Sequence, residues 1–129
     1  MTLFTKIITG EMPCHKVAED NNFIAFLDIQ PLVFGHVLIV PKLPIDYIFD
    51  HEISILQQLL VFAQPIAKAI KKCVPCKRIG IATIGLEVPH THLHLVPINS
   101  ADDLNFTRTK LTIDHKILAE LAAQIIKNL

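Results

Sequence analysis

A chain of 129 residues is long enough for one domain that buries roughly two-thirds of its unfolded surface. Its twelve basic and twelve acidic side chains cancel and form no run of one sign, which argues against a nucleic-acid or membrane-surface binder. Hydrophobic residues make up 51% of the chain, more than one core of this size needs. We therefore expect residues 1–129 to form a single domain that buries further apolar surface in a homodimer.

The cysteine count and the N-terminus indicate a compartment. Three cysteines, an odd number, argue against a disulfide framework and agree with a reducing environment. The N-terminus has no apolar run typical of a signal peptide, and no stretch is expected to approach the ~20 residues of a membrane span. These features predict a cytoplasmic protein with no membrane partner.

The first third of the chain alternates short apolar runs with turn residues. The pattern predicts a helix of one or two turns followed by three strands, at residues 4–8, 16–20, 23–28 and 36–42. Asn21 and Asn22 separate the first two strands, so these are expected to pair as a hairpin. The third strand is apolar throughout, which is typical of a fully buried strand.

A longer apolar pattern runs from Asp50 to Cys73. Its apolar residues recur at intervals of three and four, which predicts a helix with one face in the core. Asp50 is the expected N-cap, and Pro65 is expected to bend or split the helix because it removes one backbone hydrogen bond.

The remaining elements are two strands, at residues 78–86 and 92–98, and a second amphipathic helix at residues 112–129. Strands in succession around one long helix predict an α+β fold with a largely antiparallel five-stranded sheet.

Three histidines alternate with other residues in VPHTHLHLVPI, which runs from Val88 to Ile98. In a strand, His90, His92 and His94 share one face, and the outer two lie roughly 13 Å apart at about 3.3 Å per residue. One tetrahedral zinc needs its nitrogens within about 2.1 Å, so all three are not expected to bind a single ion.

Three explanations of the histidines remain open from the residues alone. They could be a coincidence in a histidine-rich chain, or a two-histidine metal site completed by ligands from elsewhere. The third explanation is phosphoryl or nucleotidyl transfer, because a neutral imidazole with a pKa of about 6.5 can attack phosphorus while its neighbours donate hydrogen bonds. The chain contains no GxxxxGK[ST] or GxGxxG phosphate loop that would compete with this third reading.

HTHLHLVP resembles the signature of the histidine triad (HIT) hydrolases and transferases, with Thr91 in an ordinarily apolar place. The run from Phe4 to Lys42, beginning FTKIITGEMPCHKV, is similar to the N-terminal half of the same family. Together with the predicted helix between them, these blocks cover residues 3–98, about three-quarters of the chain. The resemblance implies a homodimer whose sheets join, and cleavage of nucleoside monophosphates through a nucleotidyl-histidine.

The resemblance also implies roles for individual residues. His92 matches the nucleophile, His94 the contact to phosphate and leaving group, His90 the residue that orients the nucleophile, and His36 a further histidine behind the site. Asp28 matches the acid that holds the ribose hydroxyls. The other expected nucleotide-binding residues are Phe4, Ile7, Phe26, Leu27, Ile29, Glu87 and Val88.

The chain departs from the family at two places. Relatives bind structural zinc through two cysteines and a histidine at places where this chain has Thr2, Thr5 and Pro44. We therefore expect no metal and no cofactor.

The second departure is Leu86-Glu87, where phosphoramidase relatives carry a longer Gly-rich loop. A carboxylate there is expected to favour cationic amine leaving groups over polyphosphates. These features favour a phosphoramidase that acts on purine nucleotide conjugates. The alternatives are a dinucleoside polyphosphate hydrolase and a nucleotide-binding interaction protein without turnover.

Overall fold

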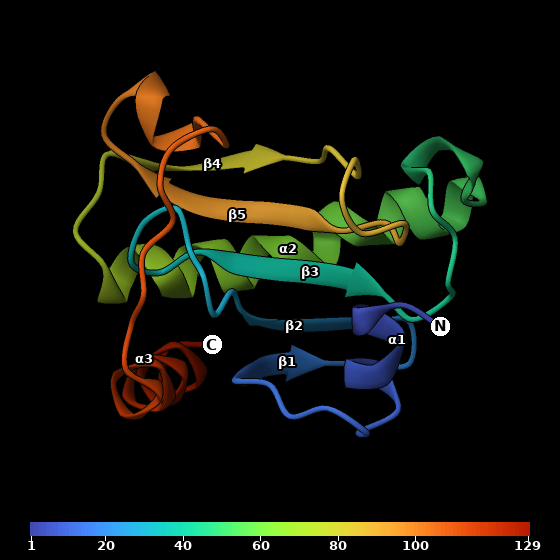
Figure 1. Ribbon diagram of the computed structural model, residues 1–129, viewed down its shortest axis with the longest axis horizontal. Coiled ribbons are helices and arrows are strands. Elements are labelled where there is room, and N and C mark those ends of the chain that lie inside the picture. The colour runs from blue at the N-terminus through green and yellow to red at the C-terminus, as the bar shows by residue number, and fades with distance from the viewer.

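The computed structural model describes residues 1–129 and is built on one five-stranded sheet in the order β1-β2-β3-β5-β4, antiparallel throughout. The strands are Lys16–Glu19, Phe23–Leu27, Val37–Pro41, Arg78–Ala82 and Leu93–Ile98, numbered in chain order. The helices are α1 (Leu3–Ile8), α2 (Ile53–Cys73) and α3 (His115–Lys127), with 3-10 turns η1 (Ile48–Asp50) and η2 (Ala101–Leu104). The α+β fold and its five antiparallel strands are confirmed (Figure 1).

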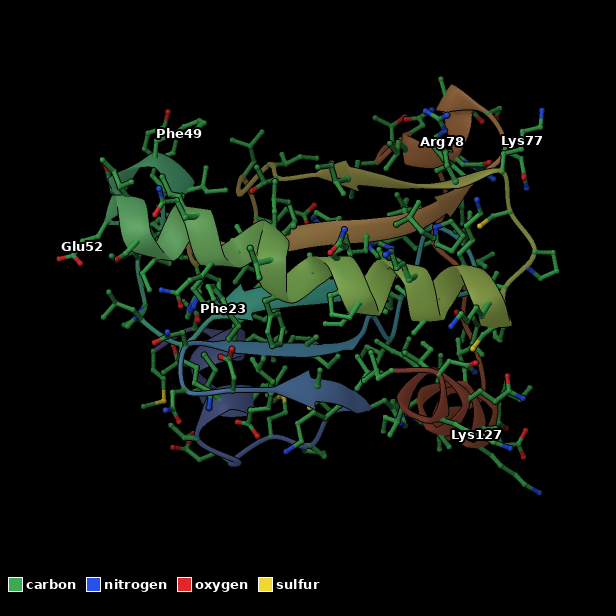
Figure 2. All side chains as sticks on the ribbon, turned by 180° about the vertical axis from the view of Figure 1, so that it is seen from behind. Phe23, Phe49, Glu52, Lys77, Arg78 and Lys127 are labelled. Carbon is green, nitrogen blue, oxygen red and sulfur yellow. The ribbon has the colours of Figure 1, made fainter.

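Helices cover the two faces of the sheet unequally. The long α2 crosses one face, as the view from behind shows (Figure 2), and α3 completes the apolar layer there with Leu118, Leu121 and Ile125. The short α1 covers part of the opposite face, where it forms a smaller apolar cluster with strand residues such as Phe26 and Leu38. This second face is less fully covered and therefore has room for a site.

Strand register places the histidines on that second face. Phe26 pairs with Leu38, and Leu38 pairs with His94, so these three residues form one row across β2, β3 and β5. Residues that lie opposite each other across a ladder point to the same face, whereas neighbours along a strand alternate. Leu93 and Leu95 accordingly pack into the larger core beneath α2.

Several predicted boundaries are wrong. Asp50 ends η1 and does not cap α2, which begins at Ile53 after Glu52. Of the two effects expected of Pro65, a bend or a split of the helix, the split does not occur, because α2 runs unbroken for 21 residues. Strand β4 ends at Ala82, short of the predicted residue 86.

The last helix begins later than predicted, at His115. The carboxylate of Asp114 caps this start by accepting a hydrogen bond from the Lys116 amide at 2.7 Å. Such a cap satisfies one of the free amides of the first helical turn, so it defines the true helix start better than apolar periodicity does.

We expected no segment with the length and apolar content of a membrane span, and this expectation is wrong. By length and apolar content alone, α2 qualifies as a candidate span. One such helix is weak evidence, since a core helix passes the same test. Here α2 buries Leu59, Ala63, Ile66, Ala69 and Ile70 against the sheet, as an amphipathic core helix does.

Gly35 sets the entry into β3. Its φ of +96° lies in the region that glycine alone adopts readily, and a Cβ added there would meet Val74 Cγ2 at 2.9 Å. Only glycine therefore fits this turn, which delivers His36 to the start of β3.

Candidate functional site

His92 lies just before β5 with one ring nitrogen committed to the backbone. Its Nδ1 lies 2.7 Å from the carbonyl oxygen of His90. A carbonyl oxygen can only accept, so the Nδ1 of His92 carries the proton and donates it. The Nε2 lone pair is consequently free, and this is the nitrogen that a nucleophilic imidazole needs.

His94 and His36 form a second chain of hydrogen bonds in the buried layer. The amide of Leu32 donates to Nδ1 of His36 at 3.1 Å, so neutral His36 carries its proton on Nε2. That Nε2 lies 2.9 Å from Nδ1 of His94 and donates to it. Neutral His94 is thereby held with its own proton on Nε2, as a hydrogen-bond donor.

Burial keeps these three imidazoles neutral. It lowers the pKa of His36 to about 4 and that of His94 to about 3, and the neighbouring charges of Lys110 and His92 act in the same direction on both. Burial also lowers the pKa of His92 below its ordinary value. At neutral pH the site therefore presents a lone pair on His92 and an N–H on His94, with no cationic imidazole.

His90 supports the site from outside it. Its ring is fully buried and lines neither cavity described below. Nε2 of His90 donates to the carbonyl of Pro41 at 2.8 Å, and its Nδ1 lies 3.4 Å from the hydroxyl of Thr2. The contribution of His90 to the site is its backbone carbonyl, which holds the ring of His92.

Two cavities meet at His92 and His94. One, of about 190 Å³, lies between α1 and β2 and is mostly apolar. All eight residues expected to bind the nucleotide border it, namely Phe4, Ile7, Phe26, Leu27, Asp28, Ile29, Glu87 and Val88. We call it the apolar cavity.

Leu27 is a partial exception among these eight. Its side chain belongs to the core beneath α2, on the opposite face of the sheet from Phe26. Adjacent residues of a strand alternate between faces, so Leu27 cannot share the side-chain role expected for Phe26.

The second cavity, of about 230 Å³, lies on the other side of the histidines, and we call it the outer cavity. Its walls combine the loop before β5 with the segment after η2 and include His36. The residues common to both cavities are Asp28, Glu87, His92, His94 and Lys110. A group attacked by His92 would lie at this junction, with one part of the substrate in each cavity.

The segment after η2 contributes site residues that were not predicted: Phe106, Thr107 and Lys110, which line the outer cavity. The Phe106 ring packs edge-on against His94, with ring centroids 4.7 Å apart. The segment that carries them has neither helical nor strand periodicity, and no motif marks it. Sequence reasoning therefore had no signal by which to find it.

The expectation that His51 is a surface histidine, like His15 and His115, is wrong for His51, which is buried next to the triad. Its Nε2 lies 3.0 Å from the hydroxyl of Thr91, and that hydroxyl also donates to the carbonyl of Ile45 at 2.8 Å. The polar Thr91 in the signature is thus satisfied by hydrogen bonds within the fold. His15 and His115, by contrast, pair with each other at the surface, 2.9 Å apart.

The N-terminal residues that replace the expected zinc ligands make hydrogen bonds instead. The Thr2 hydroxyl accepts from the Thr5 amide at 3.2 Å and lies 3.1 Å from the Thr5 hydroxyl. With the 3.4 Å contact to His90, these bonds connect the start of α1 to the triad segment. No group of three or more His, Cys, Asp or Glu side chains gathers in a way that could hold a metal ion.

The fold and the site together define an α+β protein with a histidine centre between two cavities, and the comparisons identify its family. The HIT domain family matches residues 9–101. An uncharacterized HIT-like protein of Borreliella burgdorferi is 35% identical, and the match covers 98% of this chain and 97% of that protein. The chain belongs to the HIT family, whose members include hydrolases.

Two further relatives extend the comparison. Adenosine 5'-monophosphoramidase HNT1 of Saccharomyces cerevisiae is 37% identical over 74% of this chain and 61% of its own length. The crystal structure of a HIT-like protein from Bartonella henselae superposes with a TM-score of 0.85 at 31% identity, covering 99% of this chain and 96% of that chain. The fold expected from the resemblance is thus confirmed over nearly the whole chain.

Proposed function

We propose that this protein hydrolyses nucleoside monophosphate conjugates, above all purine nucleoside phosphoramidates, through a covalent intermediate on His92. The observation that carries the proposal is the fixed tautomer of His92, whose Nδ1 is bound to the His90 carbonyl and whose Nε2 is free at the junction of two cavities. The yeast relative named as an adenosine 5'-monophosphoramidase supports the same chemistry.

The nucleoside occupies the apolar cavity in this proposal. Phe4, Ile7 and Phe26 supply an apolar slot for the base, and the Asp28 carboxylate accepts hydrogen bonds from the ribose hydroxyls. Burial raises the pKa of Asp28, and hydroxyl donors would offset the cost of keeping it charged. The leaving group then lies in the outer cavity.

The first step transfers the nucleotide to His92. The Nε2 lone pair forms a bond to phosphorus, and the bond from phosphorus to the leaving group breaks with its electron pair going to the leaving atom. His92 becomes a positively charged nucleotidyl-imidazole whose Nδ1–H is held by the His90 carbonyl. His94 stabilises the phosphate oxygens through its Nε2–H.

The second step releases the product. A water oxygen attacks phosphorus, the bond between phosphorus and Nε2 breaks with its electrons returning to His92, and a water proton passes to solvent. The nucleoside monophosphate then dissociates and the neutral His92 is restored.

The low pKa of His94 determines which leaving groups suit the site. A neutral His94 can donate a hydrogen bond, but its N–H is too weak an acid to release a proton at neutral pH. The leaving group must therefore carry its own proton or need none. A phosphoramidate protonated on its nitrogen meets this condition because it departs as a neutral amine.

A substrate panel tests the proposal. AMP and GMP conjugates with amine, acyl and phosphate leaving groups would be assayed against the wild type and His92→Asn. We expect turnover by the wild type, fastest on the amine conjugates, and a loss of about 10³-fold or more in the variant, because an amide cannot form the covalent intermediate. Nucleotide affinity should stay within a few-fold.

His115→Asn serves as the matched control, since His115 is an exposed histidine outside both cavities. It should retain full activity. More than about one per cent of wild-type activity in His92→Asn would place the nucleophile elsewhere. Nucleotide binding by a wild type that shows no turnover would instead favour an interaction protein.

A further inference from the structure

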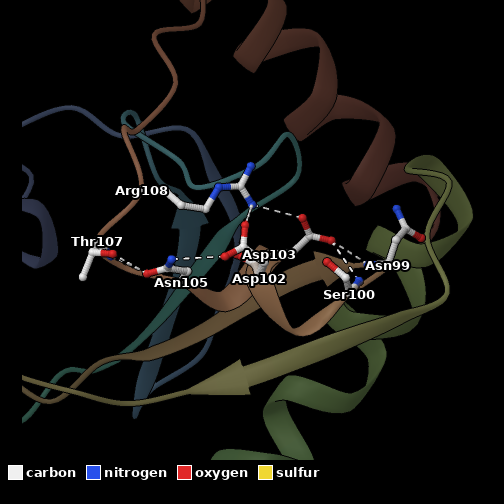
Figure 3. Close-up of polar contacts among 7 residues, drawn as sticks. All are labelled: Asn99, Ser100, Asp102, Asp103, Asn105, Thr107 and Arg108. Carbon is white, nitrogen blue, oxygen red and sulfur yellow. Dashed lines mark hydrogen bonds and ion pairs between the residues drawn. The ribbon is translucent and has the colours of Figure 1, made fainter.

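Residues 105–111, between η2 and α3, form one wall of the outer cavity, and hydrogen bonds hold this segment in place. Nη1 of Arg108 donates to Oδ1 of Asp103 at 3.1 Å (Figure 3). The same nitrogen donates to the backbone carbonyl of Asp102 at 3.0 Å. Oδ2 of Asp103 in turn accepts from the amide of Asn99 at 2.7 Å. These bonds connect the segment to the end of β5.

The far end of the segment is held as well. The Leu111 amide donates to the carbonyl of Pro31 at 2.8 Å, in the loop that leads to His36. Lys110, the residue before it, is therefore presented at a defined place beside the histidines. It borders both cavities, at the junction where the phosphate of a substrate would lie.

The charges at this junction are unequal. Lys110 is the only lysine or arginine among the residues that line the two cavities. The facing groups are the carboxylates of Asp28 and Glu87 and the imidazoles of His36, His92 and His94. A phosphate would enter a site that already holds two carboxylates, and Lys110 is the one full positive charge available to it.

Lys110 also has an ion-pair partner within the chain. Its Nζ lies 4.0 Å from Oε2 of Glu87, and the two side chains are 38% and 87% exposed. An ion pair this exposed contributes little, so its exchange for another anion costs little. The preference for cationic leaving groups was expected from an isolated negative charge on Glu87. Because Lys110 faces Glu87, that charge is not isolated.

We propose that Lys110 binds the α-phosphate of the nucleotide, and that this phosphate replaces Glu87 as the ion-pair partner of Lys110. The inference rests on the proposed function and adds a charge-recognition residue to it. Lys110 thus makes the site specific for anionic substrates, while Glu87 competes with the phosphate for the same cation. The two side chains therefore have opposite effects on nucleotide binding.

Calorimetric titration with AMP tests this without requiring turnover. We expect Lys110→Gln to weaken AMP binding about tenfold at low salt, the effect of one partly screened charge near a phosphate. Lys110→Arg should restore binding to within about threefold, because it keeps the charge. Glu87→Gln should tighten binding by about two- to threefold, and high salt should narrow all these differences.

Lys116→Gln is the matched control, an exposed lysine of the same C-terminal region that lines neither cavity. Equal AMP affinities for Lys110→Gln, Lys116→Gln and wild type would overturn the role of Lys110 while leaving the proposed function intact. Equal losses in Lys110→Arg and Lys110→Gln would show a packing effect and not a charge. A wild type that binds neither AMP nor GMP would remove both proposals together.

Discussion

At the scale of single residues, hydrogen bonds decide which nitrogen of each histidine carries the proton. The His90 carbonyl assigns the proton of His92 to Nδ1, and the Leu32 amide assigns that of His36 to Nε2. Because His36 in turn donates to His94, a backbone amide outside the signature determines how the third triad histidine meets a substrate. The chemistry of the triad therefore depends on residues that its motif does not contain.

The pKa values of these histidines predict how stability depends on pH. In the folded protein the pKa of His36 is about 4 and that of His94 is about 3, whereas an imidazole in the unfolded chain has a pKa of about 6.5. Between these values the unfolded chain binds more protons, so the stabilisation is complete above about pH 6.5 and is lost as the pH falls toward 4 and below. We expect the free energy of unfolding to fall by on the order of a few kcal/mol between pH 7 and pH 4.

His94→Gln should flatten this profile, because glutamine keeps a donor nitrogen but does not titrate. Urea unfolding at a series of pH values measures the effect, with His115→Asn as the exposed control. Parallel profiles for wild type and His94→Gln would show that His94 does not contribute to the acid sensitivity.

At the scale of elements, the N-terminal helix α1 depends on one hydroxyl. Thr2 caps α1 through the Thr5 amide and reaches His90, so it ties the helix that carries Phe4 to the triad segment. Side-chain caps of this kind are worth about 1 kcal/mol. A local hydrogen bond thus lies where the family resemblance implied a metal ligand.

Thr2→Ala should lower the free energy of unfolding by about 1 kcal/mol, and Thr2→Ser should restore most of it. Thr9→Ala is the control, since the Thr9 hydroxyl bonds only to the exposed Lys6 carbonyl.

We further expect purified protein to contain no stoichiometric zinc and chelators to leave its melting temperature unchanged. One zinc per chain by elemental analysis would contradict the assignment of Thr2 and Thr5.

At the scale of the whole molecule, one apolar surface has no partner within the chain. Strand β4 is an edge of the sheet, and beside it Leu60 and Val61 of α2 and Ile81 of β4 are 55%, 73% and 53% exposed. These residues line a shallow apolar depression. An open edge strand next to such a patch is suited to pairing with another sheet, and we propose that a second copy of the chain pairs here.

Val61→Glu should weaken this homodimer at least tenfold, because it places a charge in an apolar interface. Substitutions at the centre of such an interface typically cost about 2 kcal/mol or more of binding free energy. Sedimentation velocity over a range of concentrations measures the dissociation. The control is Ile126→Glu, a half-exposed apolar residue of α3 outside this patch. A wild-type monomer at high micromolar concentration would rule out the proposed homodimer.

The sequence by itself determined what short-range periodicity can encode. Apolar spacing identified the strands and the two long helices, and the HTHLHLVP signature together with the N-terminal block indicated the family. Errors at this level, such as the start of α2, arose because caps and 3-10 turns depend on hydrogen bonds that apolar spacing does not record.

Only the tertiary structure decided which residues complete the site. Lys110 lines the same cavities as His94 because Leu111 bonds to Pro31 and Arg108 to Asp103, and the bond to Pro31 joins parts of the chain that are far apart in sequence. Leu27 borders the apolar cavity, but its side chain packs in the core beneath α2, because the sheet buries alternate residues on opposite faces. Such placements depend on long-range packing and backbone hydrogen bonds, and these form only when distant segments are brought together.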